Sequence, residues 1–413
     1  MSKRPRRGKS SGSSERSKVS IKKARTDDSG SKSEPGETSA APEPVPPPAG
    51  TRDSEYYYED GSIILLVHDT LFKVHASLLK TQSEVIRDML TPPPGSNEGL
   101  TDQFPIKLPE VFASDFRNLL KVFYSLPSDN AFLGTQAIKD PTQAWETFNI
   151  LGGIVHLAKR FCMVDIEKWA ANQLRSLVKA SAAYVAIGAR TEMEDMVAIG
   201  FIRPFFYAID TSDTSLVHGI RNLIQYSCTQ PANISPKSLT MLLRLPQLHQ
   251  RDLGIFGFSF ITLLNLGHDG WQHKCFTRED RIAFFSAKSY LTPLPESLGQ
   301  DLTMPLLAKP PYTRAGYLDV FGDEKCSENC QRRLSLAWKS VFNSSYYLDV
   351  TSSEAMKPTT QLGRLPYLRM EFSNAVRAHG ACKIDCGAKA IESLDADINQ
   401  LFVRLAGYYQ GVE

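Results

Sequence analysis

The fold of this chain is decided by the stretch DGSIILLVHDTLFKVHASLLKTQSEVIRDML, which spans residues 60–90. Its first half holds two short apolar runs, residues 63–67 and 71–74, which are separated by a polar turn. This pattern predicts a β-hairpin. In the second half the apolar residues recur at helical spacing, and Ser83 followed by Glu84 is typical of a helix N-terminus. We therefore expect two strands followed by helical structure.

The sequence after this stretch predicts a third strand and then several helices. A proline-rich loop leads to a short strand candidate at residues 104–108. The next helix carries an apolar stripe at i, i+3, i+4, i+7 and i+8. That stripe consists of Phe116, Leu119, Leu120, Phe123 and Tyr124. Residues 126–141 are expected to form a loop, and residues 145–161 and 166–177 two further helices.

The order of these elements and several of the residues themselves resemble a BTB/POZ domain. The matching positions lie at the junction of the second strand with the helices and in the helix that follows the third strand. They are Phe72, His75, Ala76, Leu78, Leu79, Leu119 and Tyr124. The resemblance covers residues 55–180, and the layout of the whole chain is similar to fungal BTB-domain proteins of unassigned function. Two departures are Ile86, where an aromatic residue is common, and a long loop at 126–141.

The resemblance implies a fold of the α/β class: a BTB/POZ fold, with a small sheet capped by helices, followed by mainly α-helical C-terminal regions. It also implies a non-catalytic protein–protein interaction module that self-associates, docks other proteins or binds the cullin scaffold of a ubiquitin ligase. A cullin adaptor would use the helices at 83–90 and 112–124 with a helical extension behind them, for which residues 181–209 are available. These residues are equally consistent with a helical domain that only buries the end of the BTB fold.

We expect His75 to have a structural role. It stands at the junction of a strand and a helix, where its ring nitrogens can satisfy backbone groups near the helix start. No G-x4-G-K-[ST], G-x-G-x-x-G, H-E-x-x-H or G-x-S-x-G motif marks the chain as an enzyme, so we expect it not to be one.

The first 54 residues are expected to form a disordered tail, basic at first and then proline-rich. They have twelve Lys or Arg and seven Asp or Glu, no aromatic residue and few large aliphatic ones, so they cannot bury enough apolar area to offset the entropy of ordering. Two basic clusters are candidate nuclear-import signals, the alternative being a solvated tail. Their residues are Lys3, Arg4, Arg6, Arg7, Lys22, Lys23 and Arg25.

Three hypotheses about function remain open, and two of them depend on this tail. As an adaptor the protein would recruit a substrate through residues 181–413. As a transcription-related scaffold it would depend on the tail for entry into the nucleus. Nucleic-acid binding through the tail ranks lowest, because the remainder of the chain has 35 basic and 38 acidic residues, and we expect no specific nucleic acid as a partner. The expected location is the nucleus or the cytoplasm.

Residues 181–304 show a helical pattern interrupted by prolines, and residues 305–413 a proline-rich linker followed by helices. The strongest apolar run, residues 253–264, is shorter than the roughly twenty residues that cross a bilayer. It is therefore expected to be a buried helix, and we expect no contact with a membrane. In the last region two apolar stripes, one from Cys330 to Val341 and one from Ala390 to Leu405, each predict a helix.

Two Cys-x3-Cys pairs, Cys326 with Cys330 and Cys382 with Cys386, lie in the C-terminal region. On a helix each pair would share a face, so four thiolates could hold a structural zinc ion. The alternative is that these cysteines are buried apolar residues. No other cofactor is expected. His273 and Cys275 also lie close together in sequence, but without a second pair of ligands they predict no metal site.

Overall fold

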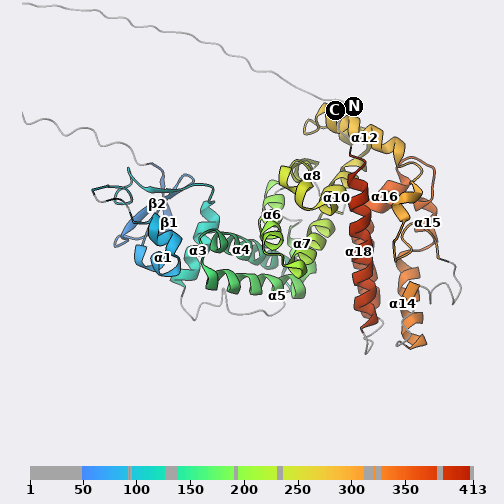
Figure 1. The fold of residues 1–413 in the computed structure, drawn as a ribbon, viewed down its shortest axis with the longest axis horizontal. Coiled ribbons are helices and arrows are strands. Elements are labelled where there is room, and N and C mark those ends of the chain that lie inside the picture. The colour runs from blue at the N-terminus through green and yellow to red at the C-terminus, as the bar shows by residue number, and fades with distance from the viewer. Residues whose placement is uncertain are drawn as a thin grey trace, which may run out of the picture. The chain divides into compact units, whose positions relative to one another are not determined.

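A four-stranded mixed sheet forms the N-terminal part of the computed structural model (Figure 1). The structure describes residues 49–125 apart from 92 and 94, and residues 138–189, 194–229, 236–310, 320–321, 327–378 and 385–409. The strands are β1 (Thr51–Tyr57), β2 (Ile63–Val67), β3 (Thr70–Val74) and β4 (Ile106–Leu108), in the order β1-β3-β2-β4. The antiparallel pair β2–β3 places Leu65 opposite Phe72 and is the predicted hairpin. The outer strands β1 and β4 each run parallel to their neighbour.

Strand β1 corrects the predicted boundary of the tail, which assigned residues up to 54 to a disordered segment. The strand begins at Thr51, and its Asp53 is buried. The Asp53 carboxylate accepts the backbone N–H groups of Glu55 and Tyr56 and pairs with Arg117 at 2.5 Å. A polar strand of this kind is held by such long-range bonds, which no local pattern in TRDSEYY reveals.

Five helices accompany the sheet: α1 (Ala76–Gln82), α2 (Glu84–Met89), α3 (Ala113–Tyr124), α4 (Pro141–Arg160) and α5 (Val164–Ala189). Ser83 separates α1 from α2 and caps α2 as predicted, because its hydroxyl accepts the N–H of Ile86. The same hydroxyl donates to the carbonyl of Phe161 beyond α4. Phe72 from β3 meets Phe116 from α3 edge-to-face at 5.0 Å. These contacts give the predicted small sheet with helices packed against it.

The helical region that follows shares a helix with this domain. Helix α5 continues past residue 180, where the sequence placed a boundary, but its backbone is non-helical at the buried Ser181, so that two helical segments meet there at a kink. The Ser181 hydroxyl accepts the N–H of Ile138 at 2.9 Å. Next come α6 (Glu194–Asp210), α7 (Thr214–Ser227), α8 (Pro236–Leu243) and α9 (Pro246–Arg251). The predicted boundary therefore falls at a kink inside one helix.

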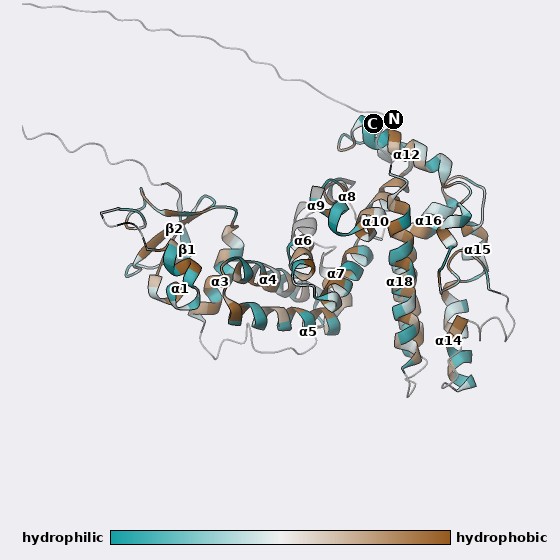
Figure 2. Ribbon diagram, viewed as in Figure 1, coloured by the Kyte–Doolittle hydropathy of each residue, from teal (hydrophilic) through white to brown (hydrophobic). Residues whose placement is uncertain are grey.

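Helix α10 (Leu253–Leu264) is the predicted buried apolar helix, and Figure 2 shows its hydrophobic character. Helix α18 (Cys386–Ala406) packs along it. The approach is so close that a Cβ on Gly257 would lie 1.9 Å from the carbonyl oxygen of Phe402. Only glycine therefore fits at position 257.

The remaining elements are α11 (Gly267–Trp271), α12 (Arg278–Tyr290), the 3-10 helix η1 (Glu296–Gly299), α14 (Glu328–Val341), α15 (Ser344–Val350), α16 (Lys357–Gly363) and α17 (Leu365–Ala378). The two C-terminal stripes form α14 and α18 as predicted, with Trp338 and Leu394 fully buried. The buried apolar side chains from Tyr56 to Ala406 form a single core cluster. Among the helices that the structure describes, none has both the length and the apolar character needed to cross a membrane.

Candidate interaction surface

His75 and Tyr124 of the signature form a half-buried aromatic cluster with Tyr58. The backbone N–H of His75 donates to the Tyr124 hydroxyl at 3.0 Å, and the hydroxyl lies 2.9 Å from His75 Nδ1. Because that oxygen accepts the backbone N–H, its own proton is available to Nδ1. His75 Nε2 then faces the Asp60 carboxylate at 3.2 Å, and this hydrogen bond lowers the pKa of Asp60. The ring of Tyr58 packs 4.9 Å from that of Tyr124.

The position of His75 is as predicted, but the partners of its ring are not. We expected the ring to satisfy backbone groups, whereas it contacts the side chains of Tyr124 and Asp60, and the His75 side chain makes no cap bond to α1. The other signature residues are also structural. Phe72, Leu79 and Leu119 are buried and Ala76 packs against the core, whereas Leu78 is 37% exposed.

A buried ion pair fixes α6 on the sheet domain. Arg203 of α6 binds the buried carboxylate of Asp115 in α3, and its guanidinium lies 4.1 Å from the ring centre of Phe112. Gly153 of α4 makes room, because a Cβ there would lie 2.8 Å from Asp115 Oδ1. Burial raises the pKa of Asp115 although the charge of Arg203 opposes this shift. Burial lowers the pKa of His156, because it disfavours the charged imidazolium, and the charge of Arg203 acts in the same direction.

Aromatic packing reinforces this joint. Phe201 of α6 lies 4.9 Å from Trp145 and 5.4 Å from Phe148, both of α4. All three rings are almost completely buried, and each buried aromatic side chain adds substantial apolar area to the interface. Helix α6 is therefore packed against the sheet domain through buried aromatic contacts.

The joint opens on one side into an apolar groove of about 550 Å³, which we call the Phe112 groove. Phe112 precedes α3 and is 50% exposed, and Met241 on α8 is 37% exposed. Among the described residues that line the groove, those that carry a charge are basic. The described lining is Phe112, Ile202, Arg203, Lys237, Thr240, Met241, Arg244, Leu245 and Cys275. Two of these basic residues are paired within the protein, Arg203 with Asp115 and Arg244 with Asp280.

Other exposed apolar side chains lie on the sheet domain. Val85 on α2 is 44% exposed, and Phe104, just before β4, is 54% exposed. Phe104 borders a second hollow that also includes Asn97 and Lys107. Of the predicted interaction helices, α2 therefore presents an apolar side chain to solvent, and Phe112 does so just before α3.

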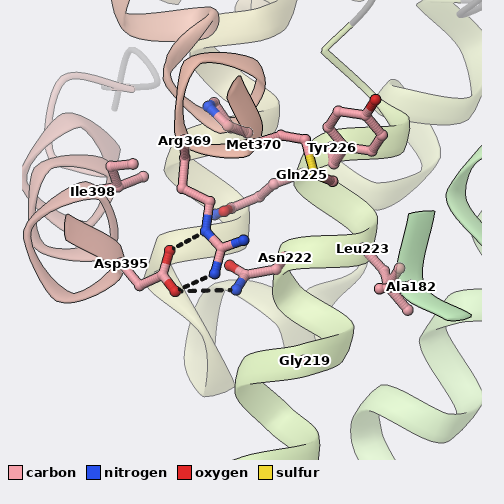
Figure 3. Close-up of a pocket in the computed structure, with 11 residues that line it drawn as sticks. Ala182, Gly219, Asn222, Leu223, Gln225, Tyr226, Arg369, Met370, Asp395 and Ile398 are labelled. Atoms are coloured by element: carbon pink, nitrogen blue, oxygen red, sulfur yellow. Dashed lines mark hydrogen bonds and ion pairs between the residues drawn. The ribbon is translucent and has the colours of Figure 1, made fainter. Parts of the chain in front are cut away.

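A polar cluster joins the C-terminal helices to α7 (Figure 3). The Asp395 carboxylate on α18 is 3% exposed and accepts two hydrogen bonds of 2.6 Å from Arg369 on α17. His218 Nε2 on α7 lies 2.9 Å away, and Asn222 donates at 3.4 Å. Burial favours a raised pKa for Asp395, but the bonds from Arg369 and His218 outweigh it and lower the pKa.

The hollow beside this cluster is small. Its volume is about 50 Å³, which exceeds the minimum of about 10–15 Å³ for one water molecule but is well below the roughly 150 Å³ of a cavity that binds benzene. The buried Nε2 of Gln225 lines it without a hydrogen-bond partner in the protein. The hollow between the three helices therefore has the size for water and not for an organic ligand.

Two sets of candidate residues cannot be placed. The basic clusters Lys3–Arg7 and Lys22–Arg25, like Cys326 and Cys382, lie outside the described residues. Of the other two cysteines, Cys330 lies on α14 and the buried Cys386 begins α18. Within the described part of the chain no three His, Cys, Asp or Glu side chains gather around a point. Structural zinc therefore stays a prediction.

The Phe112 groove was not foreseen from the sequence. Its lining comes from segments around residues 112, 202, 241 and 275, which only the packing of α6 and α8 brings together. The one local signal was the His273-x-Cys275 spacing, which borders the groove.

Comparison with known proteins agrees with this geometry. The family model of the BTB/POZ domain matches residues 60–163. Searches of curated proteins and of solved structures found no match.

Proposed function

Since residues 60–163 form a BTB/POZ domain, a protein-interaction module, we propose that this protein is a non-catalytic adaptor that connects a cullin-type scaffold to a substrate protein. In this proposal the BTB/POZ domain also mediates self-association. The helical region from residue 181 onward provides the surface that recruits the substrate.

The observation that carries the proposal is the buried packing of α6 against α3 and α4. A scaffold that docks on the BTB/POZ domain needs a binding face that does not change shape, because ordering a loose segment on binding reduces affinity. The buried Asp115–Arg203 pair and the Trp145–Phe201 contact provide that face. They also create the Phe112 groove where α3, α6 and α8 meet.

The chemistry of the groove specifies the partner segment. Its exposed lining is apolar, and its charged residues Arg203, Lys237 and Arg244 are basic. A scaffold segment with one large apolar side chain between acidic residues is complementary to it. The apolar side chain would lie against Phe112 and Met241, and the acidic groups near the rim.

The test is capture of partners by the tagged full-length chain, with bound proteins identified by mass spectrometry. The groove variant Met241→Glu places a carboxylate among apolar side chains and is expected to abolish recovery of a cullin. The matched control Leu348→Glu changes an apolar residue that is 72% exposed on α15, and it should leave recovery unchanged. Leu119→Asp, at a fully buried position, serves as the fold-breaking control.

Recovery of a cullin by the wild type and by Leu348→Glu, but not by Met241→Glu, supports the proposal. Equal recovery by all folded variants would place the docking face elsewhere. Absence of any cullin would refute the adaptor function. Self-association is tested separately by analytical ultracentrifugation, in which a single monomeric species at micromolar concentration would contradict it.

The alternative function is a nuclear transcription-related scaffold, motivated by the two basic clusters of the tail. It predicts that deletion of residues 1–25 moves a fluorescently tagged chain out of the nucleus. An unchanged nuclear signal after this deletion would exclude that version.

A further inference from the structure

We infer that Cys275 is a covalent modification site, at which an apolar α,β-unsaturated carbonyl compound that enters the Phe112 groove alkylates the thiol with His273 as the base. This site needs no bound partner protein and lies outside the BTB/POZ domain.

The geometry pairs a nucleophile with a base. Cys275 Sγ lies 3.0 Å from His273 Nδ1, and the backbone N–H of Cys275 donates to the same nitrogen at 3.3 Å. A backbone N–H can only donate, so Nδ1 is an unprotonated acceptor, and it lies within reach of the thiol proton. Transfer of this proton produces a thiolate beside an imidazolium, the form of cysteine that attacks electrophiles.

The neighbouring groups hold this pair in place. The hydroxyl of Thr240 donates to Cys275 Sγ at 3.7 Å. Arg244 donates to the Cys275 carbonyl oxygen at 2.7 Å and forms an ion pair with Asp280 at 2.6 Å, which fixes the backbone of the residue. The loop that carries the thiol is thus attached to both α8 and α12.

The groove selects the electrophile. Cys275 belongs to the lining of the 550 Å³ hollow, together with Phe112, Ile202 and Met241. A compound with an apolar body is removed from water as it enters, which raises its local concentration at the sulfur. A small polar reagent gains nothing from the same surface.

The reaction is balanced without an oxidant. Cys275 Sγ bonds to the β-carbon of the conjugated double bond, whose electron pair moves to form an enolate. The thiol proton, held in the meantime by His273 Nδ1, is returned to the α-carbon. The product is a thioether, and the base is regenerated.

Cys162 provides an internal control. It is exposed, whereas Cys275 is only partly exposed, and within the described part of the chain no histidine contacts its thiol. If accessibility alone decided the rate, Cys162 would react first. If the histidine and the groove decide it, Cys275 reacts first.

The experiment treats the full-length chain with a limiting amount of N-cyclohexylmaleimide and quantifies each labelled peptide by mass spectrometry over time. We expect Cys275 to react about tenfold faster than Cys162, and His273→Ala to remove about that factor. Met241→Glu should slow the maleimide at Cys275 several-fold but leave the rate with iodoacetamide, which is small and polar, unchanged. Faster labelling of Cys162, or an unchanged rate in His273→Ala, would overturn the inference.

One consequence rests on the proposed function: an adduct fills the groove and should reduce capture of the scaffold. Labelling at Cys275 without loss of capture would leave the modification site intact and refute only docking in the groove. Loss of capture in Met241→Glu, together with no labelling at Cys275 in the wild type, would support docking in the groove and refute the modification site.

Discussion

Replacing Arg369 by alanine is expected to destabilise the docking of the C-terminal helices by about 3–5 kcal/mol, the usual cost of leaving a buried charge unpaired. Arg369 donates both short hydrogen bonds to Asp395, whose side chain is 3% exposed. After the substitution the carboxylate keeps only His218, which is 42% exposed, and Asn222 at 3.4 Å. The exposed pair Arg251–Asp210 is the matched control. Arg251→Ala should cost no more than about 1 kcal/mol.

Hydrogen exchange followed by mass spectrometry measures this effect where it occurs. Peptides from α7, α17 and α18 should exchange roughly 100-fold faster in Arg369→Ala, because a local opening that costs about 3 kcal/mol less is more populated by about that factor. Peptides from β2 and β3 should be unaffected. Urea denaturation gives the change in the free energy of unfolding of the whole chain. The double variant Arg369→Met, Asp395→Leu should recover much of the stability lost in Arg369→Ala.

The acid dependence gives a second readout. The pKa of Asp395 is lowered in the folded state, whereas in the unfolded chain it is about 3.9. The folded state therefore binds this proton less readily, and the stabilisation is present above about pH 4 and is lost as the pH falls through the lower folded value. Arg369→Ala should weaken that dependence. A loss of stability below 1 kcal/mol together with an unchanged acid profile would refute the reasoning.

Two further substitutions test the core. Tyr124→Phe removes the hydroxyl that accepts the N–H of His75 and should cost about 1–3 kcal/mol in urea denaturation; a neutral effect would mean that water replaces the hydroxyl. Gly257→Ala forces a Cβ against the Phe402 carbonyl, 1.9 Å away, and should lower the urea midpoint by an amount equivalent to about 1–3 kcal/mol. Gly299→Ala, where the nearest atom is 3.6 Å away, should have little effect, and equal behaviour of the two variants would contradict the packing of α10 against α18.

The elements that could be predicted from the sequence are those with a strong local pattern. Examples are the hairpin of β2 and β3, the stripe of α3 and the apolar helix α10. In each of them the pattern of apolar residues depends on one element alone and can be recognised from neighbouring positions. Strand β1 could not be predicted, because Asp53 and Arg117 are 64 positions apart and their ion pair stabilises an otherwise polar segment.

The candidate site was harder to predict for the same reason. Tyr124 and His75 were identified by resemblance, but their mutual hydrogen bond depends on how α3 packs against the sheet. The Phe112 groove and the Asp395 cluster join residues that are distant in sequence, such as His218 and Asp395, 177 positions apart. Neither periodicity nor spacing carries information about such pairs, and only the tertiary structure brings them together.

The kink at Ser181 has a consequence for how this protein can be divided or recombined. Helix α5 packs against both α4 and α7, and α6 buries Trp145 and Phe148 of α4. A cut at residue 180 would separate the two helical segments that meet at Ser181, and loss of α6 would expose two large aromatic rings to water. The domain therefore cannot be exchanged as an independent unit in this chain, and a chimera that contains it must extend through residue 210. Insertions that an ordinary linker tolerates should be destabilising at this junction.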